Sequence, residues 1–251
     1  MGRQEVSLKD AVEFADNPET RCPCLLLLDT SGSMNGERIE ALKAGLQTLH
    51  DDLVRDTVAA RRIEVAIVTF NSQVRVVQDF VTVDKFQTPS LTASGETHMA
   101  AGIECALDMI EARKKTYREN HVSYYRPWVF MITDGQPEGE REEDVTRAAN
   151  RLRTDEEAKR VAFFAVGVSG ADVRRLSHIA VRTPLELEGL DFQGLFLWLS
   201  ASMQAVSLSA PGDRVTLPPP GWIKRIAMFV VDNEMEIKAA VRVGKALIGL
   251  P

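Results

Sequence analysis

CPCLLLLDTSGSM, residues 22–34, joins a continuous apolar run to a Gly/Ser loop through a single acid, Asp29. A short apolar run bounded in this way is typical of a strand that is buried on both faces of a parallel sheet. The segment that follows, 37–54, repeats leucine and isoleucine at spacings of three and four, which predicts an amphipathic helix. A strand, a tight loop and a helix in this order indicate the first unit of an α/β domain.

The same alternation continues along the chain. Strand-like runs lie at 63–70, 74–80, 127–133, 161–168 and 183–189, and helical patterns at 97–115, 141–160, 171–180 and 192–209. Asn71, Ser72 and Gln73 alone separate the first two runs, so they predict a hairpin with one antiparallel strand at the sheet edge. The expected fold class is α/β: a Rossmann-like, doubly wound, mostly parallel sheet with one antiparallel edge strand and helices on both faces.

The pattern divides the chain into three parts. We expect an N-terminal extension over 1–21, the α/β domain over 22–210, and a Pro-rich C-terminal extension of uncertain structure over 211–251. The last part begins with PGDRVTLPPPGW, which favours an extended chain. It continues with one strand-like run and one weakly helical run.

Composition narrows the possible functions. The formal charge is −6, which argues against nucleic acid as a partner, because such a partner requires a basic surface. No apolar run approaches the roughly 20 residues needed to cross a membrane, and the polar N-terminus does not look like an export signal. Three cysteines do not suggest a disulfide framework, and the pair Cys22 and Cys24 supplies too few ligands for zinc. We therefore expect a cytoplasmic protein with no membrane contact.

Oxygen-bearing side chains follow two of the predicted strands. Asp29, Ser31 and Ser33 follow the first, and Asp134 comes directly after the run 127–133. Because ligands bind beyond the carboxyl ends of parallel strands, the two acids should lie on the same rim of the sheet. Thr97, in the loop before a predicted helix, adds a third hydroxyl.

Such a set suits a hard divalent cation, Mg²⁺ or Mn²⁺. Two carboxylates only balance its charge and the hydroxyls add none, so the ion should still accept an anionic oxygen from outside. A protein partner that offers an Asp or Glu carboxylate is the expected ligand.

Each motif also has a simpler interpretation. Asp29 and its serines could form a turn or a helix cap, Asp134 with Gly135 a type I′ turn, and Thr97 a helix cap. The three motifs together, in this order and at strand ends, favour the metal site.

The segments LLLLDTSGSM, ASGETHMAAGIECAL and VFMITDGQPEGE resemble the three parts of the metal-ion-dependent adhesion site of von Willebrand factor A (VWA) domains. The resemblance covers about residues 22–210 and implies a Rossmann-like fold. It also implies that Asp29, Ser31, Ser33, Thr97 and Asp134 are the metal residues, with the two acids often acting through water.

A narrower resemblance is to bacterial tellurium-resistance proteins of the TerY type. It rests on RCPCLLLLDTSGSM, FLWLSASMQAVS and PGDRVTLPPPGW. It implies a role in tellurite or other stress resistance, with kinase-like or phosphatase-like proteins as partners. Glu96 departs from the family pattern, in which a glycine usually precedes the threonine. Its carboxylate would either tighten metal binding or repel an acidic partner.

Two other functions compete with a binding module. A metal-dependent phosphohydrolase of haloacid-dehalogenase type also begins with an acid at a strand end, but it needs a second acid two residues later, where this chain has Ser31. A hydroxyl cannot act as that general acid near neutral pH. His98, next to Thr97, is the remaining candidate for acid–base chemistry, although a surface residue at a helix start is the simpler interpretation. The other possibility is a structural protein whose metal only stiffens the rim. We expect no enzymatic activity.

Overall fold

The computed structural model describes residues 8–168, 170–210, 213–223 and 230–232. Its centre is a six-stranded sheet with the order β3-β2-β1-β4-β5-β6. The strands are β1 (Cys22–Asp29), β2 (Ile63–Phe70), β3 (Val74–Thr82), β4 (Trp128–Thr133), β5 (Ala162–Gly167) and β6 (Leu185–Glu186). All neighbours pair in parallel except β2 and β3, so the expected mostly parallel sheet with one antiparallel edge strand is confirmed.

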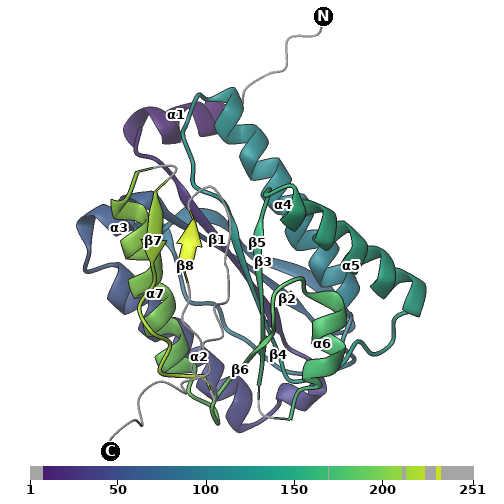
Figure 1. The fold of residues 1–251 in the computed structure, drawn as a ribbon. Coiled ribbons are helices and arrows are strands. Elements are labelled where there is room, and N and C mark those ends of the chain that lie inside the picture. Colours follow the sequence, from purple (N-terminus) through teal and green to yellow (C-terminus); the bar gives the residue numbers. More distant parts are fainter. Residues whose placement is uncertain (1–7, 169, 211–212, 224–229, 233–251) are drawn as a thin grey trace, which may run out of the picture.

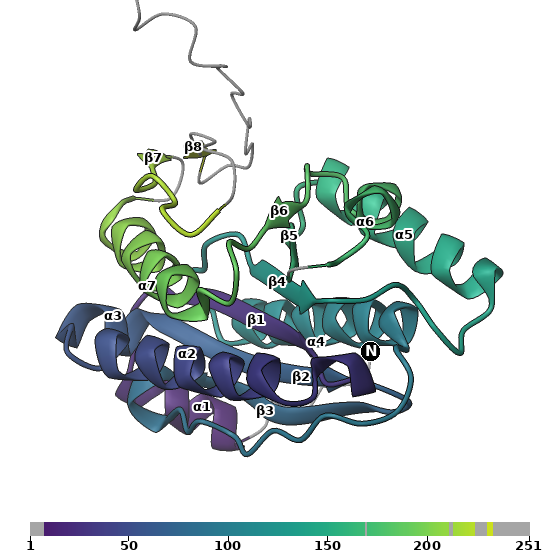
Figure 2. The same ribbon diagram turned by 90° about the horizontal axis from the view of Figure 1, so that it is seen from below.

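Helices cover both faces of the sheet (Figures 1 and 2). One face carries α2 (Glu37–Leu53), α3 (Thr57–Arg62) and α7 (Phe192–Leu208), whose apolar side chains share one core cluster. The other face carries α4 (Met99–Glu119), α5 (Glu142–Glu157) and α6 (Val173–Ile179), which share the second cluster. The fold is therefore a three-layer sandwich of helices, sheet and helices.

Strand β1 shows why its sequence is apolar without interruption. Cys24, Leu26 and Leu28 face the cluster beneath α2 and α7. Leu25 and Leu27 face the cluster beneath α4 and α5. Successive side chains of a strand point to opposite faces, so a strand with helices on both sides needs an apolar residue at every position.

A network of buried charged side chains lies at the end of the sheet where the parallel strands begin. The Glu64 carboxylate accepts hydrogen bonds from Arg21 Nε at 2.9 Å, from Arg113 Nε at 2.8 Å and from the Tyr117 hydroxyl. The side chains of Arg21 and Glu64 are fully buried. Burial by itself would lower the pKa of Arg113, but the hydrogen bonds and the charge of Glu64 raise it overall. The network therefore holds ionised groups inside the protein.

Two helices were not expected from the sequence. Helix α1 (Leu8–Asp16) precedes the sheet, and α3 (Thr57–Arg62) lies between α2 and β2. Helix α3 begins at Asp56, whose carboxylate accepts hydrogen bonds from the amides of Val58 and Ala59. Asp56 is therefore an ordinary N-cap residue. The sequence alone did not predict the helix, because six residues are too few to show a helical period.

Part of the Pro-rich segment packs on α7. Trp222 is buried and meets the ring of Trp198 edge-on, and the Trp198 indole N–H donates to the Pro218 carbonyl at 2.7 Å. Strands β7 (Arg214–Thr216) and β8 (Val230–Asp232) pair antiparallel in a separate small sheet. The helical run expected near the C-terminus lies outside the described residues. Among the residues described, no helix is long and apolar enough to cross a membrane.

Helix α7 packs tightly against α2 at Gly45. A Cβ at this position would lie 2.6 Å from a ring carbon of Phe196 and 2.9 Å from Cβ of Phe192. We expect Gly45→Val to lower the free energy of unfolding by about 1–3 kcal/mol, because overpacking forces the two helices apart. Urea denaturation measures this change. Ala44→Val, on the exposed side of the same helix, should change it by less than about 0.7 kcal/mol, and equal effects of the two variants would contradict the close contact.

Candidate metal centre

The sheet brings the two predicted acids to one rim. Asp29 is the last residue of β1, and Asp134 follows the last residue of β4. The two strands are parallel neighbours in which Leu28 pairs with Ile132, so their ends lie side by side. The convergence expected from the strand ends is therefore present.

Asp29 is buried, and both of its carboxylate oxygens are held. One accepts the Ser31 amide at 2.8 Å, and the other accepts the Thr133 hydroxyl at 2.6 Å. Burial nevertheless raises the pKa of Asp29, against the lowering effect of these hydrogen bonds. Burial disfavours the ionised form of this carboxylate, and a cation bound beside it would favour that form. Sequence reasoning missed Thr133, although its position beside Asp134 was available as a signal.

The two serines connect Asp29 to Asp134. The Ser31 and Ser33 hydroxyl oxygens are 3.0 Å apart, and Ser33 donates to Asp134 at 2.7 Å. Gly32, between the serines, donates its amide to the Gly95 carbonyl at 2.9 Å. A Cβ on Gly32 would lie 3.3 Å from that carbonyl oxygen, so a glycine lets the two loops meet.

Thr97 completes the set from a third segment. Its side chain is nearly buried, and its carbonyl accepts the Glu138 amide at 3.0 Å, which ties its loop to the loop after β4. A Cβ on Gly135 would lie 3.6 Å from the Thr97 hydroxyl oxygen and 3.9 Å from an Asp29 carboxylate oxygen. The Thr97 hydroxyl and the Asp29 carboxylate therefore both lie beside Gly135.

A cavity of about 360 Å³ opens over this rim. Ser33, Thr97 and Asp134 line it, together with the loop that follows Asp134. The structure thus brings all five predicted residues together: two carboxylates and three hydroxyls from three segments. This donor set fits a hard divalent cation. No cluster of three or more His, Cys, Asp or Glu side chains suited to a metal occurs among the described residues.

Glu96 and His98 lie on the rim beside Thr97. The Glu96 carboxylate is 3.2 Å from His98 Nε2. The backbone amide of Glu96 donates a hydrogen bond to the Ser72 hydroxyl at 2.9 Å. Gly139 lies against both side chains, since a Cβ there would overlap the Glu96 carboxylate. The Glu96 carboxylate is thus engaged with its neighbours, and its effect on a metal or a partner stays a prediction.

Arg38, in the first turn of α2, is a site residue that sequence reasoning missed. Its Nη1 donates to the Ser33 carbonyl at 2.9 Å and forms an ion pair with the Asp134 carboxylate. The sequence offers no signal for this contact, because Arg38 and Asp134 are far apart along the chain. The candidate centre therefore contains one cation of the protein itself.

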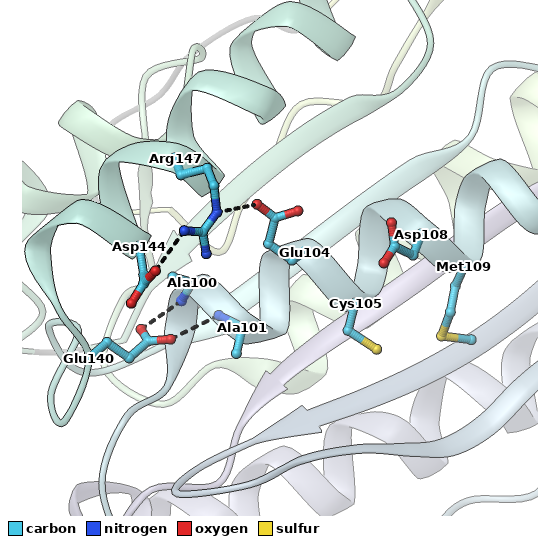
Figure 3. A pocket seen from close by; sticks show the side chains of 9 residues that line it. All are labelled: Ala100, Ala101, Glu104, Cys105, Asp108, Met109, Glu140, Asp144 and Arg147. Carbon is cyan, nitrogen blue, oxygen red and sulfur yellow. Dashed lines mark hydrogen bonds and ion pairs between the residues drawn. The ribbon is translucent and has the colours of Figure 1, made fainter.

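A larger cavity, of about 590 Å³, lies between α4 and α5 (Figure 3). Its Glu140 carboxylate accepts the amides of Ala100 and Ala101 at 2.7 and 2.9 Å, which caps the start of α4. Arg147 pairs with Asp144 and with Glu104 on the facing helix. No hydroxyl side chain lines this cavity, and its acids cap a helix or pair with arginine, so its donor set suits a hard cation less well than that of the rim.

The fold is that of an α/β domain whose sheet rim gathers oxygen side chains as candidate ligands for a cation. The family model of the von Willebrand factor type A domain matches residues 25–186, and the chain belongs to this family. Members of the family commonly mediate metal-dependent protein interactions. No curated protein sequence gives a significant match.

Solved structures share the fold at low sequence identity. A von Willebrand factor type A protein from Catenulispora acidiphila has a TM-score of 0.57 at 17% identity, over 74% of this chain and 43% of its own. The ArnB paralog VWA2 from Sulfolobus acidocaldarius has a TM-score of 0.52 at 13% identity, over 85% of this chain and 62% of its own. Proximal thread matrix protein 1 from the mussel byssus has a TM-score of 0.52 at 16% identity, over 74% of this chain and 48% of its own. The match thus spans less than two thirds of each of these proteins.

Proposed function

We propose that this chain is a divalent-metal-dependent protein-binding module. Asp29, Ser31, Ser33, Thr97 and Asp134 would hold Mg²⁺ or Mn²⁺, and the ion would take a carboxylate of a partner protein. The observation that carries this proposal is the convergence of these five side chains, from three separate segments, at one rim of the sheet, where Ser33, Thr97 and Asp134 line a cavity. A bound cation supplies a Lewis-acidic position for an anionic oxygen.

The arrangement of the ligands supports an open rather than a closed site. Asp29 and Ser31 are buried at its base, whereas Ser33 is exposed and the cavity opens to solvent. Two carboxylates neutralise a divalent ion, and neutral hydroxyls leave it able to accept another negative oxygen. An Asp or Glu side chain of a partner fits this requirement in charge and size.

We propose no enzymatic role. The hydroxyl of Ser31, two residues after Asp29, bonds to Ser33, so this position offers no general acid to a phosphohydrolase. We also propose a cytoplasmic setting in stress or tellurite resistance, with a kinase-like or phosphatase-like partner. Its support is the sequence resemblance to proteins of the TerY type, and the three unpaired cysteines suit a reducing compartment.

Substitutions of Thr97 test whether the rim binds a divalent metal. We expect Thr97→Ala to weaken Mn²⁺ binding by about tenfold or more, because it removes one hydroxyl ligand. Thr97→Ser keeps the hydroxyl and should bind close to wild type. Isothermal titration of metal-stripped protein measures both affinities, and thermal melts in EDTA should be the same for the three proteins.

A second measurement tests whether the bound metal accepts a carboxylate. In the Mn²⁺-loaded wild-type protein, titrated acetate should displace a metal-bound water and lower the water-proton relaxation rate. Metal binding without any response to acetate would favour the structural interpretation. Equal Mn²⁺ affinity of wild type and Thr97→Ala would contradict the metal site itself.

A further inference from the structure

Arg38 connects three parts of the candidate centre. Its guanidinium contacts the Ser33 carbonyl and the Asp134 carboxylate, and its other terminal nitrogen would lie 3.9 Å from a Cβ on Gly170. Gly170 lines the same cavity as Ser33 and Asp134. The Arg38 side chain is 35% exposed, whereas that of Asp134 is fully buried. The cation therefore lies at the edge of the cavity, between the buried ligands and solvent.

This position changes the charge of the centre. The carboxylates of Asp29 and Asp134 carry two negative charges, and an arginine stays protonated at any physiological pH. Among these three groups alone, the metal-free net charge is −1, and a divalent ion would bring it to +1. Glu138 and Asp172 also line the cavity and add negative charge to it. Arg38 therefore makes the metal-loaded centre one unit more positive than it would be without the guanidinium, which favours a carboxylate ligand.

We propose that Arg38 is a specificity-determining residue that makes the metal centre select an anionic ligand. It weakens the binding of the ion alone by repulsion and strengthens the binding of a carboxylate to the loaded centre by attraction. The inference rests on the proposed metal-dependent function and names a residue outside the five ligands. The two effects have opposite signs, which distinguishes this role from that of a residue that only positions Asp134.

The hydrogen bonds of Asp134 also favour a role of Arg38 beyond positioning. Asp134 is already oriented by the Ser33 hydroxyl at 2.7 Å, which bonds to the other carboxylate oxygen. The Asp134 position therefore has a second support when the guanidinium is removed. The loss of Arg38 removes its positive charge together with its hydrogen bond to the Ser33 carbonyl, and Arg38→Lys separates the two because it keeps the charge.

The test compares wild type with Arg38→Gln and Arg38→Lys. Arg153→Gln is the matched control, because Arg153 is an exposed arginine on α5, three residues from Asn150, whose side chain it contacts. Each metal-stripped protein is titrated with Mn²⁺ by calorimetry, and each loaded protein is then titrated with acetate and followed by water-proton relaxation. We expect Arg38→Gln to bind Mn²⁺ about five- to tenfold more tightly and acetate about five- to tenfold more weakly. Arg38→Lys and Arg153→Gln should stay within about twofold of wild type.

The other outcomes decide between the two proposals. If wild type binds Mn²⁺ and Arg38→Gln binds it more weakly, Arg38 only positions Asp134, and the inference is wrong while the metal-dependent function stands. Unchanged affinities in Arg38→Gln overturn the inference in the same way. If only Arg38→Gln binds Mn²⁺, wild type takes up no ion by itself, and this outcome contradicts both the proposed function and the selective role of Arg38. If neither protein binds the ion, both the function and the inference fail.

Discussion

Replacing Asp29 by alanine is expected to abolish divalent-metal binding. Asp29 is a buried carboxylate at the rim, and its two oxygens accept hydrogen bonds from the Ser31 amide and the Thr133 hydroxyl. Removal of one of two charged ligands leaves half of the ion's charge without compensation, so we expect affinity to fall by at least about a hundredfold. Isothermal titration with Mg²⁺ and Mn²⁺ measures the loss.

Thermal stability provides a second readout of the same variant. Metal at about 100 times its dissociation constant should stabilise wild type by about 2.7 kcal/mol, since it binds the folded state alone. Asp29→Ala should show no such increase. Asp51→Ala is a suitable control, because Asp51 is an exposed acid near the far end of α2 from the rim. A metal-induced increase in melting temperature that persists in Asp29→Ala would place the ion elsewhere.

The largest loss of stability is expected for Glu64→Gln. The Glu64 carboxylate is the shared anion for Arg21 and Arg113, and it also accepts the Tyr117 hydroxyl. A neutral amide leaves the fully buried Arg21 guanidinium without its counter-charge and presents an N–H group toward donors. We expect the free energy of unfolding to fall by about 3–5 kcal/mol, as for other buried ion pairs that lose one partner. Urea denaturation at neutral pH measures this change.

An exposed ion pair on α2 supplies the comparison. Glu40 accepts a hydrogen bond from Lys43 at 2.7 Å, but both side chains are substantially exposed. Glu40→Gln should cost less than about 1 kcal/mol, because solvent screens the pair. Similar losses for the two variants would mean that the charges around Glu64 contribute little beyond those at the surface. Metal affinity should be the same in both folded variants, since Glu64 lies near the start of β2, at the opposite end of the sheet from Asp29 at the end of β1.

The sequence predicted the ligand set because each residue is adjacent to a recognisable element. Asp29 ends an apolar run, Asp134 follows another, and both runs read as strands buried on two faces. In a parallel sheet the two run ends must share a rim, which fixes the acids relative to one another before any side chain is placed. Thr97 was found by its loop and by family resemblance. The structure brings these residues together, and metal binding by them stays a prediction.

Short and long-range features were harder to predict. Helix α3 is only six residues long, too short for a periodic pattern to distinguish it from a loop. Thr133 is the last residue of a strand and looks like part of the apolar run, yet its hydroxyl orients Asp29. Arg21, next to a predicted strand, and Glu64, at the second position of another, look like ordinary surface charges, although both are buried.

The sequence by itself determined the layered α/β fold, the antiparallel edge and the rim on which the candidate oxygen ligands meet. These follow from local patterns, since the period of apolar residues defines each element and strand direction defines the rim. Only the tertiary structure decided which charges face one another: Arg38 with Asp134 at the rim, and Arg21 and Arg113 with Glu64 at the opposite end. A charged residue carries no local sign of its partner, because ion pairs across the fold depend on how the helices are packed against the sheet.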